Sequence, residues 1–184
     1  PAVDVHSIVR RDREILLAST GDDSIYSVPL DADGDPAGPC VRTWTHPSRP
    51  HEPTDRMHLN SLALLDGHLV ATRFGEKPEP GTWRCAVNGE CFQPDTGRTW
   101  LGGLHHPHSL FCCRDRVMVC ESARQQVRIL RRSESGFAEA EPWQLRGFLR
   151  GLTRSERHWF VGSSETRDVS RSRGSPIADL VGLP

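Results

Sequence analysis

The sequence NSLALLDGHLVA at residues 60–71 contains two short apolar runs on either side of Asp66-Gly67. Asp-Gly between apolar runs is typical of a two-residue type I′ turn, so this stretch predicts a β-hairpin. Near copies begin at three other places, and each starts with a polar, a small and an aliphatic residue. The four triplets are His6-Ser7-Ile8, Asn60-Ser61-Leu62, His108-Ser109-Leu110 and Arg150-Gly151-Leu152, at intervals of 54, 48 and 42 residues. Repetition at this period, with strands in every unit, predicts an all-β fold of the β-propeller class.

The rest of each unit supports blades of four antiparallel strands. The other three hairpins turn at Asp12-Arg13, at Arg114-Asp115 and at 155–157. Outer strands rich in β-branched and aromatic residues are expected at 24–28, 40–45, 83–87, 98–101, 126–130 and 143–145. We expect one domain over residues 1–184 with repeat units 1–54, 55–103, 104–146 and 147–184. The last unit is incomplete, because residues 167–174 form a charged, Ser-rich stretch that indicates a loop.

The number of blades has two interpretations. An incomplete fourth blade would leave unpaired strand edges, which proteins normally avoid. This favours a segment of a larger propeller, for which we expect six blades. The chain begins at Pro1 with neither an initiator methionine nor a signal segment, which indicates a removed leader or a piece of something longer. The alternative is a complete four-bladed domain whose last strands are supplied by the chain ends.

Composition narrows the partners and the cellular compartment. The 184 residues are 36% apolar and 26% charged, as in an ordinary globular protein, and the net charge of -1 gives no reason to expect nucleic acid or a membrane as partner. No apolar run approaches the roughly 20 residues of a transmembrane helix. The six cysteines form no CxxC pair, and a turn at Asn88-Gly89 would place Cys85 and Cys91 on opposite faces of a hairpin. We therefore expect reduced thiols and a cytoplasmic protein.

The hairpin turns also predict which residues face each other. Counting back from each two-residue turn pairs His6 with Ser19, Asn60 with Arg73, His108 with Glu121 and Arg150 with Ser163. The first strand of each propeller blade lines the central channel, so the first residues of the four triplets are expected to surround one channel mouth. His58 lies two residues before Asn60 and therefore on the same face of the strand.

These residue types suggest a site for a small anionic molecule. His6, His58 and His108 are candidate ligands of a divalent metal ion, the one cofactor that the sequence suggests. We expect His108, Glu121 and Arg150 to be catalytic, and Arg73, Arg150 and Asn60 to bind a substrate carboxylate or phosphate. The function so predicted is a metal-assisted hydrolase or lyase.

Three alternatives stay open from the sequence. The propeller could be a non-catalytic module that binds a ligand, or one that binds a protein, and the polar residues at the strand starts could simply hydrogen-bond loop backbone. Ser7, Ser61 and Ser109 recur in three blades and point to the opposite face of the strand, so we expect them to be structural and not nucleophiles.

Several of these segments also resemble a known family. MHLNSLA at 57–63, PHSL at 107–110 and GFLRGL at 147–152 are similar to motifs of an uncharacterised bacterial family of conserved hypothetical proteins with a domain of unknown function, over about residues 4–176. The resemblance implies a propeller-like fold and no established reaction. A more distant likeness connects the chain to the six-bladed gluconolactonase and senescence-marker hydrolases, which hold a divalent cation at the channel mouth. Their cation ligands are acidic and amide-rich, whereas this sequence offers histidine and arginine.

Overall fold

The computed structural model describes residues 2–47, 54–77, 82 and 85–164, and this part of the chain is built from β-strands. The strands are β1 (Val5–Arg11), β2 (Glu14–Ser19), β3 (Ser24–Pro29), β4 (Val41–Thr45), β5 (Leu59–Leu65), β6 (His68–Arg73), β7 (Gly89–Phe92), β8 (Thr99–Leu104), β9 (Pro107–Cys113), β10 (Arg116–Glu121), β11 (Gln126–Ser133), β12 (Gly136–Gln144), β13 (Phe148–Arg154) and β14 (Trp159–Ser164). Two short 3-10 turns, η1 (Thr20–Asp22) and η3 (Ser122–Arg124), follow β2 and β10. No helix in the described residues is long and apolar enough to cross a membrane.

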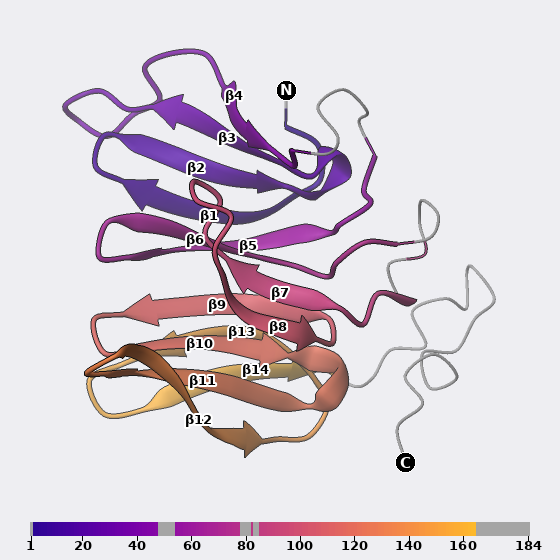
Figure 1. Ribbon diagram of the computed structural model, residues 1–184. Coiled ribbons are helices and arrows are strands. Elements are labelled where there is room, and N and C mark those ends of the chain that lie inside the picture. Colours follow the sequence, from indigo (N-terminus) through magenta and orange to yellow (C-terminus); the bar gives the residue numbers. More distant parts are fainter. Residues whose placement is uncertain (1, 48–53, 78–81, 83–84, 165–184) are drawn as a thin grey trace.

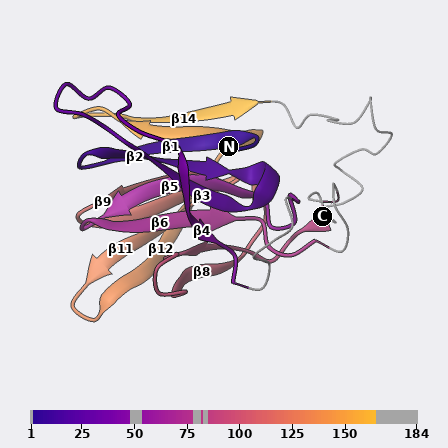
Figure 2. The ribbon, with the colours of Figure 1, turned by 90° about the horizontal axis from the view of Figure 1, so that it is seen from above.

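The strands form successive antiparallel sheets, which we call blades 1 to 4. Blade 1 has the order β1-β2-β3-β4, blade 2 β5-β6-β7-β8, blade 3 β9-β10-β11-β12, and blade 4 contains β13 and β14. The first strand of each blade packs against the first strand of the next, from β1 to β5, β9 and β13. Figure 1 shows blades 1, 2 and 3 one below the other, with blade 4 overlapping blade 3, and the view from above shows β14 apart from β11 and β12 (Figure 2). The predicted all-β propeller fold is confirmed.

The hydrophobic core lies between the blades. Leu16, Ala18 and Ile25 of blade 1 pack against apolar residues of blade 2, and a second cluster joins blade 2 to blade 3. A third cluster places Leu149 of blade 4 against Met118 of blade 3. Face-to-face burial of this kind removes apolar surface from water on both sides of a sheet and fixes the order of the blades.

The two end blades each expose a large apolar side chain on their free face. Ile8 pairs with Leu17, on the face of blade 1 that points away from blade 2, and it is 66% exposed. Phe160 pairs with Thr153 on the corresponding face of blade 4 and is 55% exposed. Exposed apolar side chains on open sheet faces suit a segment of a larger propeller. The number of blades stays a prediction.

All four predicted hairpins are present. Arg11 pairs with Glu14, Leu65 with His68, Cys113 with Arg116, and Arg154 with Trp159. At the hairpin that revealed the repeat, Asp66 and Gly67 have φ angles of 51° and 80°. Positive φ at both central residues is the requirement of a type I′ turn, and it explains the Asp-Gly pair.

The outer strands of blade 2 differ from the prediction. The third strand is β7 at Gly89–Phe92 and not residues 83–87, of which Trp83 and Arg84 lie outside the described residues. Gly89 therefore begins a strand instead of forming a turn with Asn88. A Cβ on Gly89 would lie 2.8 Å from the carbonyl oxygens of Arg73 and Leu104, so this glycine allows close approach of backbone and does not serve a turn. Cys85 and Cys91 are consequently not in one hairpin, and all six cysteines are free.

The predicted register of the inner hairpins is wrong by one residue at the start of each first strand. A β-bulge interrupts each ladder between the turn and the start of the first strand. Each residue at the end of the second strand therefore pairs with the residue just before its predicted partner on the first strand. Ser19 pairs with Val5, Arg73 with Leu59, Glu121 with Pro107, and Ser163 with Leu149. Counting from a turn assumes an unbroken ladder, and the bulge adds one residue to the first strand only.

Candidate functional site

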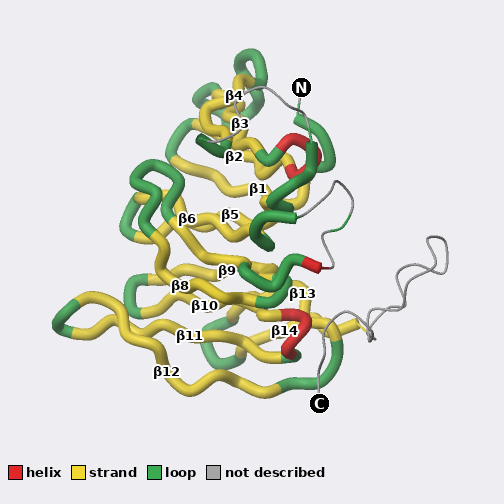
Figure 3. Tube along the Cα trace, turned by 45° about the vertical axis from the view of Figure 1, so that its right-hand side comes forward, coloured by secondary structure: helices red, strands yellow, loops and turns green. Residues whose placement is uncertain are grey.

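The first residue of each triplet lies at or beside the bulge of its blade. In blades 1 and 2 the interruption falls on His6 and Asn60. In blade 4 it spans Arg150 and Gly151, and in blade 3 it follows His108 directly. A bulge re-aims side chains that a regular ladder would hold perpendicular to the sheet. The turns η1 and η3, which contact these residues in blades 1 and 3, lie at the same side of the stacked blades (Figure 3).

In blade 1, a hydroxyl connects the imidazole of His6 to the next blade. Thr20 Oγ1 donates to the carbonyl oxygen of Leu59, which can only accept. The hydroxyl has one hydrogen, so its contact with His6 Nδ1 requires that Nδ1 carry the proton and donate. His6 is thereby held as the tautomer whose Nε2 bears the lone pair.

Blade 3 repeats this arrangement with a serine. Ser122 Oγ donates to the carbonyl oxygen of Leu149 at 2.6 Å, and His108 Nδ1 lies 2.9 Å from Ser122 Oγ and 3.0 Å from the carbonyl oxygen of His106. Both groups can only accept from the ring, so Nδ1 is the protonated nitrogen of His108 as well. Its Nε2 also bears the lone pair.

Blade 2 achieves the same link directly. Asn60 Nδ2 donates to the carbonyl oxygen of Pro107 at 2.9 Å, while its Oδ1 accepts from Thr72 Oγ1 at 2.7 Å. In all three blades the carbonyl that is reached belongs to the residue just before the next triplet: Leu59, Pro107 or Leu149. The polar first residue of the triplet therefore joins one blade to the next. This is the structural role that the sequence left open, and it uses only one side of each imidazole.

The other sides of the rings belong to a cluster at the strand starts, which we call the mouth cluster: His6, His58, His106, His108 and Arg150, with Phe74 and Phe148. The ring centroids of His6 and His58 are 5.3 Å apart, and His58 lies 4.4 Å from Phe74. The ring of Phe74 also stacks on that of His106, with centroids 4.8 Å apart, and makes an edge-on contact with the ring of His108, with centroids 4.9 Å apart. Phe148 lies 5.5 Å from His108 and 5.4 Å beneath the guanidinium of Arg150.

Burial and charge keep two of these imidazoles neutral. Burial lowers the pKa of His108 well below 6.5, and the charge of Arg150 lowers it further. Burial also lowers the pKa of His6, against Asp4, which raises it, and with further lowering by His58 and Arg150. Arg150 of blade 4 is therefore close enough to act on histidines of blades 1 and 3. It is exposed, as is His6, whereas His108 is buried.

An ion pair lies behind His58. Its Nδ1 is 3.0 Å from Asp55 Oδ2, and Lys77 Nζ is 2.5 Å from Asp55 Oδ1. Burial would raise the pKa of Asp55, but the hydrogen bonds from His58 and Lys77 outweigh it and lower that pKa. Lys77 is itself buried, so the carboxylate is held in place between a buried cation and the ring of His58.

Two predicted site residues lie elsewhere. Arg73 donates from Nε to Glu90 at 2.6 Å and lies over Phe92, between blades 1 and 2. Glu121 is fully buried and accepts hydrogen bonds from the backbone N–H of His105, from Gln126 and from Arg128. Asn60 is also buried, with both ends of its amide hydrogen-bonded as described above.

Among the described residues, no three His, Cys, Asp or Glu side chains are grouped so that they could hold a metal ion. The structure thus brings together His6, His58, His108 and Arg150 of the predicted site. Arg73 and Glu121 are engaged in ion pairs within their own blades.

The sequence did not reveal His106 and Phe148 as members of the mouth cluster. Both lie two residues before a triplet, the position that Asp4 and His58 hold in the first two units. Asp4, His58 and His106 have φ angles of 56°, 53° and 52°. Positive φ is uncommon in residues other than glycine, and such residues are concentrated at active sites and ligand-binding sites. Comparing the four units at the position two residues before the triplet would have revealed His106 and Phe148. Phe74 follows a strand and has no repeat signal.

The structure defines a propeller-class protein with a histidine and arginine cluster at one end of its blades. The chain belongs to the family described as Domain of unknown function (DUF4915), whose family model matches residues 2–182. This match confirms the resemblance to a family of unknown function, while the likeness to gluconolactonases stays an expectation. No curated protein matches the chain.

Similar solved structures share little sequence with the chain. The computationally designed Ika4 protein is 11% identical with a TM-score of 0.49, over 88% of this chain and 86% of that one. The N-terminal domain of Nup159 is 12% identical with a TM-score of 0.48, over 90% of this chain. A chain in the structure of the S. cerevisiae complex of Dbp5 with Nup159 and Gle1 is 13% identical with a TM-score of 0.49, also over 90% of this chain. The present chain spans 41% of each of these last two.

Proposed function

We propose that the mouth cluster binds a small anionic molecule that carries hydroxyl groups, such as a hydroxy acid or a sugar acid. One observation carries this proposal: His6 and His108 both use Nδ1–H on a hydroxyl of their own blade, which leaves the Nε2 lone pair, while Arg150 lies close enough to lower the pKa of both. The cluster therefore combines hydrogen-bond acceptors with a cation. A hydroxyl-bearing anion supplies the matching donors and charge.

Each group has a defined part in binding. The guanidinium of Arg150 offers two parallel N–H donors to a carboxylate or phosphate, and Phe148 supports it from below. Nε2 of His6 and Nε2 of His108 accept from ligand hydroxyls. Because both imidazoles are neutral near pH 7, they do not compete with Arg150 for the anionic group.

The same geometry favours one reaction type if the propeller is an enzyme. A neutral imidazole whose Nδ1–H is fixed by a carbonyl oxygen is oriented to take a proton at Nε2, and His108 meets this description. His108 would take the proton from the carbon next to the carboxylate held by Arg150. The hydroxyl group on the neighbouring carbon would leave and receive that proton, so that a C=C bond forms and water is lost, as in a lyase. The metal-assisted reaction predicted from the sequence would need metal ligands in addition to His6, His58 and His108, because these three are not grouped as a metal site. In this proposal the histidines therefore act as hydrogen-bond acceptors and bases.

Isothermal titration calorimetry with matched pairs of acids tests the binding proposal. Gluconate, lactate and glycerate are compared with hexanoate and propionate, which lack hydroxyl groups. We expect saturable binding of a hydroxy acid and at least about tenfold weaker binding of its deoxy partner, because Nε2 of each histidine then finds no donor. Arg150→Gln should weaken binding by about tenfold or more.

The chain offers a matched control for the arginine. Arg154 lies on the same strand and 5.7 Å over the ring of Trp159, much as Arg150 lies over Phe148, but it is outside the cluster. Arg154→Gln should leave binding unchanged. Equal losses in the two variants, or no saturation by any hydroxy acid, would overturn the proposal. Stoichiometric Zn²⁺ or Mn²⁺ binding that is lost in both His6→Ala and His108→Ala would replace it with the metal-assisted alternative.

A further inference from the structure

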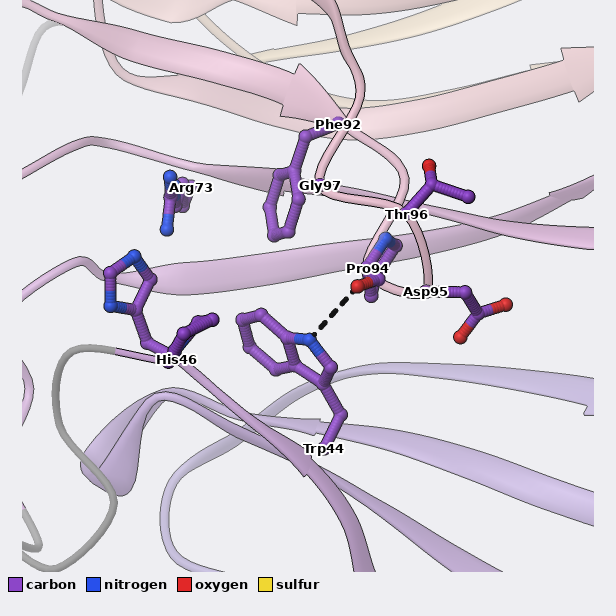
Figure 4. Close-up of a pocket in the computed structure, with 9 residues that line it drawn as sticks. Trp44, His46, Arg73, Phe92, Pro94, Asp95, Thr96 and Gly97 are labelled. Carbon is purple, nitrogen blue, oxygen red and sulfur yellow. Dashed lines mark hydrogen bonds between the residues drawn. The ribbon is translucent and has the colours of Figure 1, made fainter.

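A pocket lies between blades 1 and 2, separate from the mouth cluster. Its volume is about 360 Å³, within the range of small-molecule sites. One wall comes from β4 and the residues after it, and the other from blade 2 with the turn between β7 and β8 (Figure 4). The lining residues are Trp44, His46, Pro47, Arg73, Phe92, Pro94, Asp95, Thr96 and Gly97.

The aromatic wall is fixed before any ligand arrives. Trp44 Nε1 donates to the carbonyl oxygen of Pro94 at 3.2 Å, which locks the indole of blade 1 to the turn of blade 2. The ring centroid of Trp44 lies 5.7 Å from that of Phe92 and 6.4 Å from that of His46. Rings held in this way lose little entropy when a ligand binds between or against them.

Arg73 supplies the polar end of the pocket. Its guanidinium carbon lies 4.7 Å over the ring of Phe92, and Nε and Nη2 both donate to Glu90 Oε1. Nη1 of Arg73 donates no hydrogen bond to any of the residues that the structure describes. Figure 4 places the guanidinium beside His46 and Phe92, at the edge of the pocket. The ion pair with Glu90 therefore positions Arg73 and leaves one nitrogen for a ligand.

We propose that this pocket binds a planar aromatic carboxylate of one or two rings. The indole of Trp44 and the ring of Phe92 offer flat apolar surfaces that favour an aromatic partner over a saturated one. Arg73 Nη1 donates to the carboxylate. The volume suits one such molecule and not an extended chain. The site shares no residue with the mouth cluster and does not depend on the function proposed for it.

Three probes of similar size separate the parts of this proposal. Benzoate carries both the ring and the charge, cyclohexanecarboxylate lacks the aromatic ring, and benzamide lacks the charge. Titration of the full chain, followed by calorimetry and by saturation-transfer NMR, should show benzoate binding about tenfold more tightly than either of the others. Indole-3-carboxylate should bind at least as well as benzoate, because a second ring covers more of Trp44.

Variants assign the binding to the pocket. Thr96→Phe fills the pocket from an exposed position and should abolish benzoate binding without loss of folding. Arg73→Lys keeps a charge beside Glu90, but its one nitrogen pairs with Glu90 and no second nitrogen remains for the ligand, so benzoate affinity should fall to that of benzamide. Trp44→Leu should weaken benzoate about tenfold.

Trp100 provides the matched control, since Arg98 lies 5.3 Å over its ring on the same blade but outside the pocket. Trp100→Leu should leave benzoate binding intact, and so should Arg154→Gln. Equal affinity for benzoate and cyclohexanecarboxylate, unchanged binding in Thr96→Phe, or equal losses in Trp44→Leu and Trp100→Leu would each overturn the proposal.

Discussion

The hydroxyl of Ser61 accepts a hydrogen bond from the backbone N–H of Ser109 at 2.8 Å, across neighbouring first strands of blades 2 and 3. The same bond joins the other blades. Ser7 Oγ accepts from Leu62 N at 3.0 Å, and Ser109 Oγ accepts from Gly151 N at 2.6 Å. The serine at the second position of the triplet is therefore a connector between blades, as its recurrence in three units suggested. In blades 3 and 4 the paired N–H, that of Ser109 or Gly151, lies at the bulge and outside the regular ladder.

Ser61→Ala should lower the free energy of unfolding by about 1 to 2 kcal/mol, because the variant leaves the N–H of Ser109 without its partner. Urea denaturation followed by circular dichroism measures the change. Ser135→Ala, in the exposed turn between β11 and β12, should stay within about 0.5 kcal/mol of the parent. A loss for Ser61→Ala no larger than that of the turn variant would remove the connector role.

Thr20→Val should destabilise the protein by about 1 to 3 kcal/mol, since it breaks the link between His6 Nδ1 and the carbonyl oxygen of Leu59 at a buried position. Thr20→Ser keeps the hydroxyl and should cost less. ¹⁵N NMR of the His6 ring provides a readout that loss of stability alone would not change. We expect the Nδ1–H tautomer in the parent and in Thr20→Ser, and a mixture of tautomers in Thr20→Val; an unchanged tautomer in Thr20→Val would contradict this assignment.

His108 should make stability fall in mild acid. Burial lowers its pKa in the folded state below the unfolded value of 6.5, so only the unfolded chain takes up the proton as the pH drops through 6.5. The contribution is fully present above pH 6.5 and is lost below it, with a slope of at most about 1.4 kcal/mol per pH unit. His108→Gln should remove this slope, whereas exposed His158→Gln should retain it. Parallel curves for the parent and His108→Gln between about pH 4 and 7 would refute the prediction.

Asp23 should act in the opposite direction. Burial raises its pKa from 3.8 to about 6, although its carboxylate accepts from the backbone N–H groups of Arg56, Met57 and Leu59. A carboxyl with a raised pKa in the folded state gives stability that is present below about pH 4 and is lost as the pH rises to about 6. The stability of the parent relative to Asp23→Asn should therefore decline over this window and stay level above it. A relative stability that rises with pH would show that the three N–H groups outweigh burial.

Gly162→Ala should disrupt blade 4. A Cβ on Gly162 would collide with the carbonyl oxygen of Arg150, at the bulge that interrupts the pairing of β13 with β14. We expect a loss of about 2 kcal/mol or more, together with faster hydrogen exchange of the N–H groups of β14. At Gly102 the nearest atom to a Cβ is 3.9 Å away, so Gly102→Ala should cost little. Similar losses at the two glycines would mean that the bulge tolerates a side chain.

The hairpins could be predicted because they are local. An Asp-Gly turn between apolar runs fixes its own geometry, and four units with the same pattern agree with one another. The gathering of His6, His58, His108 and Arg150 also follows from their common place near the strand starts. Burial between blades, which the apolar residues of β2, β6 and β10 suggest, is a consequence of the same alternation.

The remaining features depend on contacts between strands that are apart in the sequence. No residue type predicts a bulge. The one extra residue in the first strand shifts the pairing, so that Arg73 pairs with Leu59 and Glu121 with Pro107. Their charges are then neutralised by Glu90 and Arg128, which lie on other strands. The strand at 83–87 was predicted from β-propensity, but the close backbone contacts around Gly89 determine where β7 runs.

The serine connectors run in one direction along the chain, from Ser7 to blade 2, from Ser61 to blade 3 and from Ser109 to blade 4. The fourth triplet has Gly151 in place of serine, so a strand laid against β13 on its open side would meet no hydroxyl there. Blade 4 therefore cannot make, from this position, the side-chain contact that joins blades 1 to 2, 2 to 3 and 3 to 4. The loss of one hydroxymethyl group makes the fourth unit chemically distinct from the three units whose triplets it otherwise repeats.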